Sequence, residues 1–252
     1  MKKLFVLLTV FLMVFAAGCA KEDGKETAEP KKTPYKIEIG SVYRSYTAED
    51  GMEIIYINAE YPIIVNSEEN EDIAAFNEMY RQNADDYINA VIADFSEKAG
   101  NAYAESPEDF EEYLFTQQCE VTFNKNGYLS IKRDYTEEYS DFTGEETYAD
   151  VYDMNAVRAL YANEVISASA DDTMQIIFLG YTAVADEYPE RFKEGYVDIL
   201  NSAITETEFY LTDTAMVFVM QPGIATYPEY GCLMFEMPYE GNEAFFKKIL
   251  DE

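Results

Sequence analysis

The sequence predicts an α+β fold, with antiparallel sheets and helices packed on one face, arranged as two small consecutive domains. Three observations support this class. Strand-like and helix-like segments are segregated along the chain instead of alternating strictly. Apolar residues make up 48% and aromatic residues 15% of the 252 residues, enough for a sizeable core. A polar stretch at residues 101–112, containing Pro107, separates a first group of elements from a second.

The N-terminal 34 residues predict an export signal followed by a tether. Two lysines precede an apolar run at residues 4–15, three small residues follow it, and Cys19 comes next. This order predicts a lipoprotein signal peptide at residues 1–18 and lipidation of Cys19 by fatty acids such as palmitate. The apolar run is too short to span a bilayer, which needs about 20 residues. Residues 19–34 then form the lipidated cysteine and a flexible polar tether, which anchors an extracytoplasmic protein to the cell membrane.

Residues 35–112 predict the first α+β domain. Residues that favour strands fill 35–46 and 52–65, with Glu49-Asp50-Gly51 as the turn between them. Between residues 67 and 95, apolar residues recur at steps of three and four, which predicts an amphipathic helix. Acidic residues crowd its N-terminus, where the helix dipole favours them. The apolar positions are Ile73, Phe76, Tyr80, Ala84, Tyr87, Val91 and Phe95.

Residues 113–252 predict a second α+β domain. Strand-like runs at 115–123 and 128–139 are joined by Asn124-Lys125-Asn126-Gly127, a strong hairpin signal, and a third run follows at 147–154. The chain closes with three further strand-like runs, at 208–211, 216–220 and 232–237. These runs predict antiparallel pairing within the second domain.

Two helices are predicted between these groups of strands. Ser169 and Asp172 resemble a capping box that begins a helix ending near Ala185. Pro189 is suited to the first turn of a further helix. The apolar face of that helix would consist of Phe192, Tyr196, Ile199 and Ala203.

The charge and composition exclude several classes of function. The sequence contains no histidine, which excludes a Ser-His-Asp triad, a Cys-His dyad and a histidine-ligated zinc site. It has 49 acidic and 18 basic residues, a formal net charge of −31. Such a body repels nucleic acid and attracts cationic partners. We therefore expect no enzyme activity, no catalytic residue, no metal site and no cofactor.

Cys119 and Cys232 are the cysteines that remain after Cys19. Outside the cytoplasm a disulfide between them is permitted. Their separation along the chain leaves two alternatives open, a disulfide or two separate buried thiols.

Short motifs in the second domain carry a resemblance to a known family. Residues 128–131 and 135–139 read YLSI and YTEEY, and residues 151–154 place an aromatic–aspartate pair on a strand. Toward the C-terminus come FYLT, MVFV, IA, YG and FEMP, at residues 209–212, 216–219, 224–225, 230–231 and 235–238. In these motifs the chain resembles the extracytoplasmic domain of RsiV-type anti-sigma factors. That domain, of unknown general function, also occurs in PdaC-type peptidoglycan deacetylases.

The first domain resembles the smaller domain that precedes this one in both protein types, on the basis of Tyr61-Pro62 and the helix around Asn77. The chain also departs from its relatives. We expect neither the transmembrane signalling segment of the anti-sigma factors nor the histidine-dependent domain of the deacetylases. Where the family often has a histidine after the aromatic strand, this sequence has Gly144-Glu145-Glu146.

The resemblance implies a binding role outside the cell. RsiV-type domains are associated with binding lysozyme, a basic protein, which an acidic body attracts on charge grounds. We therefore expect a non-catalytic envelope lipoprotein that binds lysozyme or another cationic wall-associated protein. The alternative is an accessory module that binds peptidoglycan. The candidate ligand-binding residues are Tyr227, Tyr230 and Tyr239, in loops flanking the last strand, together with Glu145 and Glu146.

Overall fold

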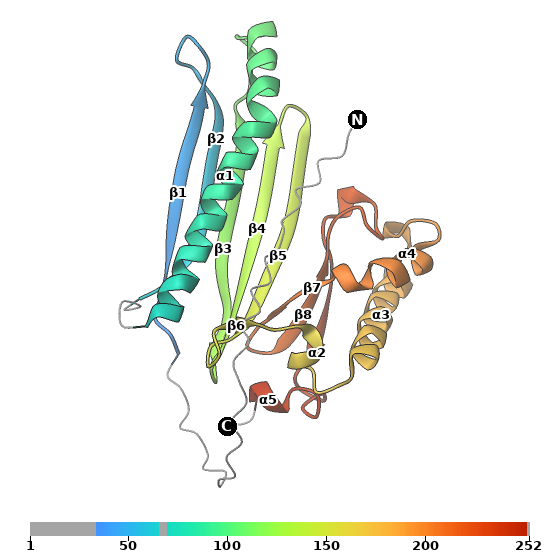
Figure 1. The fold of residues 1–252 in the computed structure, drawn as a ribbon. Helices are drawn as coiled ribbons and strands as arrows, with labels where there is room; N and C mark the ends of the chain where they lie inside the picture. The colour runs from blue at the N-terminus through green and yellow to red at the C-terminus, as the bar shows by residue number, and fades with distance from the viewer. Residues whose placement is uncertain (1–33, 66–69, 251–252) are drawn as a thin grey trace. The chain divides into compact units, whose positions relative to one another are not determined.

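The computed structural model describes residues 34–65 and 70–250, and its α+β architecture confirms the predicted fold class (Figure 1). The predicted signal peptide, the lipidation of Cys19 and nearly all of the predicted tether lie outside the described residues. Residues 31–252 belong to one compact unit. Within the described ranges, no helix is both long enough and apolar enough to cross a membrane.

The first sheet has six strands in the order of the chain, β1 to β6, and every neighbouring pair is antiparallel except β2 and β3. That parallel pair departs from the expected antiparallel pattern, because a helix returns the chain along the sheet between the two strands. It also joins, in one sheet, segments that the sequence assigned to two consecutive domains. The strands are β1 (Ile37–Thr47), β2 (Glu53–Ile64), β3 (Tyr113–Lys125), β4 (Tyr128–Tyr139), β5 (Phe142–Asp153) and β6 (Arg158–Ala159).

The connecting helix, α1 (Glu71–Glu105), lies across one face of this sheet (Figure 1). It begins where the Asn70 side chain accepts hydrogen bonds from the N–H groups of Asp72 and Ile73. It runs ten residues beyond the predicted end, because Ala99 continues the buried stripe and Pro107 then prevents further helix. The stripe consists of Ile73, Phe76, Tyr80, Ala84, Ile88, Val91, Phe95 and Ala99, so Ile88 takes the buried position expected for Tyr87.

The β3–β4 hairpin forms as predicted. Asn126 and Gly127 both have positive φ, 55° and 80°, as a two-residue turn that matches the strand twist requires. A register shift between Val121 and Phe123 then turns Phe123 toward the opposite face of the sheet from α1. That face joins the second core of the molecule.

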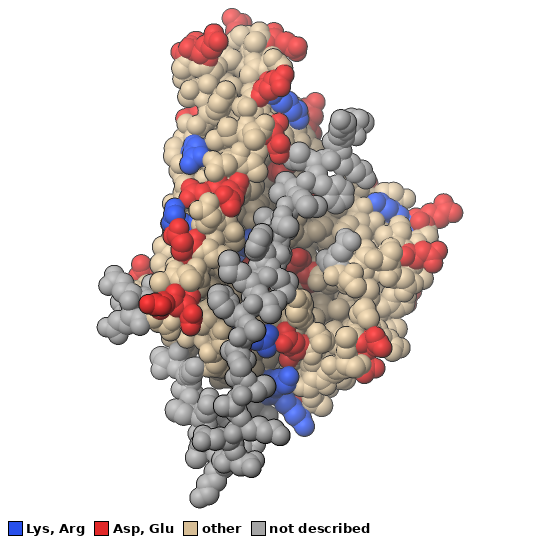
Figure 2. Space-filling model, viewed as in Figure 1, with Lys and Arg blue, Asp and Glu red and all other residues tan. Residues whose placement is uncertain are grey.

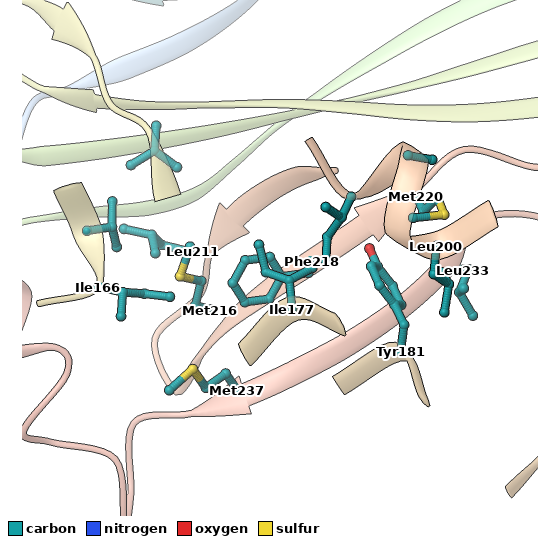
Figure 3. Close-up of a cluster of buried hydrophobic side chains, with 14 of the residues drawn as sticks. Ile166, Ile177, Tyr181, Leu200, Leu211, Met216, Phe218, Met220, Leu233 and Met237 are labelled. Atoms are coloured by element: carbon teal, nitrogen blue, oxygen red, sulfur yellow. The ribbon is translucent and has the colours of Figure 1, made fainter. Parts of the chain in front are cut away.

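The second sheet is antiparallel, with β8 (Ala215–Met220) between β7 (Glu208–Leu211) and β9 (Leu233–Pro238). Helix α3 (Ala170–Glu187) packs on it and starts at the predicted cap, where Ser169 Oγ accepts a hydrogen bond from the Asp172 N–H at 3.1 Å. Figure 3 shows Ile177 of α3 beside Phe218 of β8, and Tyr181 of α3 near Leu200 and Leu233, all within one core. Every residue of β8 is buried, since the strand lies within this core. Two short helices, α2 (Ala162–Val165) and α5 (Lys247–Leu250), were not predicted.

The prediction of one continuous helix beginning at Pro189 is wrong. A single 3₁₀ turn, η2 (Pro189–Arg191), is followed by extended chain, and α4 (Tyr196–Ala203) starts only after Gly195 at φ 73°. The break occurs because Phe192 pairs with Thr226 and the Lys193 N–H donates to the Ala225 carbonyl. Tertiary pairing therefore overrides the local helical pattern.

Candidate functional site

The predicted candidates Glu145 and Glu146 are neighbours on β5 and therefore face opposite sides of the first sheet. Glu146 lies opposite Tyr135 of β4, whose ring contacts Tyr87 of α1, so Glu146 is on the α1 side. The Tyr148 hydroxyl donates a hydrogen bond to Glu146 Oε2 at 3.0 Å. The structure thus gives Glu146 an aromatic setting that Glu145 does not share.

On this face, β4 and β5 present a row of tyrosines and carboxylates that we call the tyrosine–carboxylate strip: Tyr135, Glu137, Tyr139, Glu146 and Tyr148. The row arises because alternate residues of paired antiparallel strands share one face. The Tyr135 ring lies edge-on to Tyr87 at 5.0 Å and to Tyr148 at 5.4 Å between centroids. Glu146 is exposed, and the other four side chains are half-buried.

Lys98 of α1 shows which chemistry the strip accommodates. Its ammonium nitrogen lies 3.8 Å from the centroid of the Tyr139 ring, a close cation–π contact. Burial raises the pKa of Glu137, repulsion by Glu146 raises it further, and the charge of Lys98 acts in the opposite direction. Burial lowers the pKa of Lys98 itself, and attraction to Glu137 acts against that effect. The aromatic face and the carboxylates of the strip therefore attract a cation, and burial of the cation opposes this attraction.

A second acidic region lies at one end of the first sheet, where the β1–β2 turn meets the end of α1. The Tyr103 hydroxyl joins the two by donating to Asp50 Oδ2 at 2.7 Å. Neither residues 48–56 nor residues 99–114 contain a lysine or arginine. We call this region the acidic tip, visible as red atoms at the upper end in Figure 2; it consists of Glu49, Asp50, Glu53, Glu105, Glu108, Asp109, Glu111 and Glu112.

No lysine or arginine within the two segments of the acidic tip neutralises its carboxylates. Burial raises the pKa of Glu112. A hydrogen bond that the protonated Glu112 carboxyl donates to Glu53 raises it further, as does repulsion by Glu53. Glu112 Oε1 is buried without a hydrogen-bond partner among the described residues. The acidic tip therefore holds negative charge that a cationic partner would stabilise.

A buried ion pair lies beside the strip, one step further along β4 and β5. Arg133 Nη2 donates to Asp150 Oδ2 at 2.7 Å, and the Tyr80 hydroxyl of α1 donates to the same oxygen at 2.9 Å. The Arg133 side chain is 6% exposed, so its charge depends on Asp150 for compensation. Tyr152 completes the group through a 3.2 Å hydrogen bond with Tyr80. This group ties α1 to the two strands that carry the strip.

Glu208 of β7 connects the second sheet to this pair. Its Oε2 accepts a hydrogen bond from the Ala149 N–H of β5 at 3.5 Å. Burial raises the pKa of Glu208 to about 7, with repulsion by Asp150 as the second cause. The junction between the two sheets therefore contains a carboxyl group that titrates near neutral pH.

Replacing Glu208 with glutamine should flatten the dependence of stability on pH. The folded protein holds the Glu208 proton more tightly than the unfolded chain, so this group stabilises the fold below about pH 4.5 and the stabilisation is lost as pH rises through 7. We expect the wild type to lose on the order of 1–2 kcal/mol between pH 5 and pH 7.5 through this group. Urea unfolding at both pH values measures it. Equal pH dependence in Glu208→Gln and in a Glu236→Gln control at an exposed position of β9 would contradict the prediction.

Two of the three predicted tyrosines lie on the connection between β8 and β9. Tyr227 and Tyr230 are 43% and 44% exposed, as expected. The Tyr227 N–H donates to the Arg191 carbonyl at 3.0 Å, and the Arg191 guanidinium lies 5.7 Å from the Tyr230 ring. A cavity of about 50 Å³ opens beside Arg191, Tyr230 and Cys232. This size accommodates only a few water molecules.

Tyr239, the third predicted tyrosine, was expected to be exposed and is instead 5% exposed. Its hydroxyl donates to the Thr212 carbonyl at 3.1 Å, and its ring packs edge-on against Phe246. The residue immediately after β9 turns into the core because the final segment of the chain folds back over it. Tyr239 is therefore a core residue.

Cys119 and Cys232 are free thiols. Cys119 belongs to the core under α1, whereas Cys232 lines the cavity beside the second sheet, so the two sulfur atoms have no route to each other. Burial raises the pKa of Cys119 to about 12 and also raises that of Cys232. Within residues 34–65 and 70–250, no group of three acidic or cysteine side chains is arranged to hold a metal ion.

Comparison with known proteins identifies related folds. No family model and no curated protein matches the sequence. Solved structures do match, among them a member of the DUF3298 family from Bacteroides fragilis and a DUF3298 family protein from Pseudomonas aeruginosa. The fold resembles that of DUF3298 family proteins.

The Bacteroides structure is 18% identical, with a TM-score of 0.56, and the match covers 85% of this chain and 95% of the other. The Pseudomonas structure is 12% identical, with a TM-score of 0.51, and the match covers 84% and 94% of the two chains. DUF3298 denotes a domain of unknown function. At these identities the DUF3298 structures establish the fold alone, so the chemistry of the site has to be argued from this chain's own residues.

The sequence pattern singled out Glu146 as a candidate but not Lys98, Arg133 or Asp150, which lie in or beside the strip. In the sequence, Arg133 shares one strand face with Leu129 and Ile131, and a charged residue at a position that faces the core indicates a buried partner. No comparable signal existed for Lys98, because its contact with Tyr139 depends on how α1 crosses the sheet.

Proposed function

We propose that this chain is a non-catalytic envelope lipoprotein that binds a cationic protein outside the cell, lysozyme or another basic wall-associated protein. The single observation that carries the proposal is the uncompensated negative charge of the acidic tip, in a chain whose formal charge is −31. Charge of this kind steers a basic partner and fixes its orientation.

The tyrosine–carboxylate strip supports the same partner. Lys98 on Tyr139 is an internal example of an ammonium group bound by an aromatic face near Glu137. Tyr148 and Glu146 repeat this pair of groups one step along the strands. Among the described residues, none places a cation over Tyr148, so a lysine or arginine of the partner would find an unoccupied aromatic face there.

Neutralising four glutamates of the acidic tip should weaken binding of lysozyme by about tenfold. Each exposed charge contributes a few tenths of a kcal/mol, so the four together contribute about 1.4 kcal/mol, which corresponds to that factor. The variant carries Gln in place of Glu49, Glu105, Glu108 and Glu111. The matched control carries Gln at four exposed positions near the second sheet, Glu187, Glu190, Glu194 and Glu240. Calorimetry at low and high salt measures both, and the wild type should bind more weakly as salt rises.

Absence of lysozyme binding at low salt would overturn the proposal for that partner. Equal weakening in the two variants would show that the affinity depends on net charge and not on the position of the acidic tip. The exposed rings of Tyr227 and Tyr230 favour a second candidate, a module that binds peptidoglycan. That candidate instead requires binding to purified peptidoglycan that is insensitive to salt and is lost in a Tyr227→Ala, Tyr230→Ala variant.

A further inference from the structure

The outer edge of β1 carries unpaired backbone groups. The Val65 N–H donates to the Lys36 carbonyl, so the even-numbered residues of β1 bond to β2. The N–H and C=O groups of the odd-numbered residues, from Ile37 to Ser45, therefore point away from β2 toward the open edge. Within the described ranges, no hydrogen bond reaches them. A strand of eleven residues with such an edge is a template for pairing with another chain.

Other strand edges of this molecule are closed by side chains that we call amide clamps. An amide clamp is an Asn or Gln side chain that bonds both the N–H and the C=O of one backbone residue. Asn77 clamps Ile64 beyond the last β2 residue paired with β3, and Gln221 clamps Thr147 on the outer edge of β5. Asn124 clamps Tyr35, just before β1. Among the residues that the structure describes, no amide clamp closes the edge from Ile37 to Ser45.

The side chains of this edge are apolar and exposed. Ile39 is 46% and Tyr43 54% exposed, and both lie on the sheet face opposite to α1. Tyr43 is held by its ring contact with Tyr56 at 5.1 Å and by its hydroxyl, which donates to Glu53. Exposed apolar side chains on a strand with one unpaired edge mark an interaction surface.

The charge of β1 favours a second copy of this chain as the partner that pairs with its outer edge. β1 contains one acidic and one basic residue, Glu38 and Arg44, whereas the chain as a whole carries −31. A second copy of this chain is repelled by most of the surface but not by this strand. The strand is also self-complementary: with Ser41 on a two-fold axis, antiparallel pairing sets Glu38 opposite Arg44 of the second copy and Ile39 opposite its Tyr43, each twice.

We propose that two copies of this chain associate through β1, paired antiparallel about Ser41, so that their first sheets form one continuous sheet. Each copy then satisfies the free edge of the other, and the apolar and charged pairs each form twice by symmetry. The proposal is independent of the cationic partner, because no residue that would pair across the two copies belongs to the acidic tip or to the tyrosine–carboxylate strip.

Cysteine cross-linking in the full chain tests both the association and its register. In an antiparallel pair, opposite Cα atoms lie about 4.5–5.5 Å apart, within the range of a disulfide, so a Ser41→Cys chain should cross-link to itself on mild oxidation. Ser45→Cys is the matched control on the same edge, because two residues at 45 would lie about 26 Å apart in this register. We expect a disulfide-linked dimer of the first variant and at least tenfold less of the second.

Sedimentation of the wild type and of a Tyr43→Lys variant provides an independent measurement. The wild type should show a dimer whose fraction rises with concentration. The lysine should shift the protein to monomer without altering its circular dichroism, because Tyr43 is more than half exposed. Equal cross-linking at positions 41 and 45, or a wild type that stays monomeric at all concentrations, would overturn the proposal.

Discussion

Replacing Asp150 with alanine is expected to lower the free energy of unfolding by about 3–5 kcal/mol, the range for breaking a buried ion pair. The loss arises mainly at Arg133, whose side chain is 6% exposed and would keep its charge without compensation. The Tyr80 hydroxyl would lose the same acceptor. Because α1, β4 and β5 meet at this group, we expect one cooperative transition at lower urea concentration.

The matched control for Asp150 is Asp213→Ala. Asp213 also forms an ion pair at 2.7 Å, with Lys125, but the two side chains are 67% and 52% exposed. Exposed pairs contribute about 0–1 kcal/mol, so this variant should unfold within that margin of the wild type. Equal losses in the two variants would show that burial of Arg133 does not set the energy.

Replacing Gly180 with alanine is expected to lower the free energy of unfolding by about 1–3 kcal/mol, the range for overpacking a core. An added Cβ would meet the Phe235 ring, lying 2.6 Å from its Cδ2 atom. That ring cannot move freely, because it stacks on Phe218 at 4.8 Å and contacts Tyr181 at 4.9 Å. The clash should exceed the gain of about 1 kcal/mol that alanine usually brings to a helix.

Gly100 is the matched control for Gly180, since it also lies in a helix but has nothing within 4 Å of an added Cβ. Gly100→Ala should raise the free energy of unfolding by about 0.5–1 kcal/mol. Replacing the ring with a smaller side chain, in a Gly180→Ala, Phe235→Leu double variant, should recover part of the lost free energy of unfolding. Urea unfolding measures this recovery. Stabilisation of Gly180→Ala to the level of Gly100→Ala would contradict the packing argument.

The elements predicted well are those specified by local sequence. The 3.6-residue spacing from Ile73 to Phe95 fixes α1, and the positive φ that Asn126 and Gly127 tolerate fixes the β3–β4 turn. The Ser169 hydroxyl oxygen caps α3 by accepting a hydrogen bond from the N–H of Asp172, three residues later. In each case the physical cause lies within a few residues of the element, so a single sequence is sufficient.

The elements predicted poorly depend on residues far apart in the chain. The parallel pairing of Ile55–Ala59 with Tyr113–Gln117 needs α1 as a crossover, and the break after Arg191 needs Thr226 as a partner for Phe192. Tyr239 has a loop-like neighbourhood in sequence and becomes buried only through Phe246. Their local patterns are compatible with more than one structure.

The candidate site shows the same division. Glu146 could be chosen from the sequence, but its relation to Tyr135 and Tyr148 depends on the β4–β5 register. A shift by one residue would move Glu146 to the other face and replace it with Glu145. A sequence with adjacent glutamates therefore does not reveal which of the two takes part in the strip.

The amide clamps have a consequence for the chemical ageing of this protein. Each clamp uses an amide because only an amide offers an acceptor and a donor side by side, as the N–H and C=O of one residue require. Deamidation of Asn77, Asn124 or Gln221 would replace the donor with a carboxylate oxygen facing a carbonyl, and repulsion would then open a strand edge. Slow hydrolysis of these side chains would therefore expose strand edges progressively as the protein ages, and exposed edges favour aggregation.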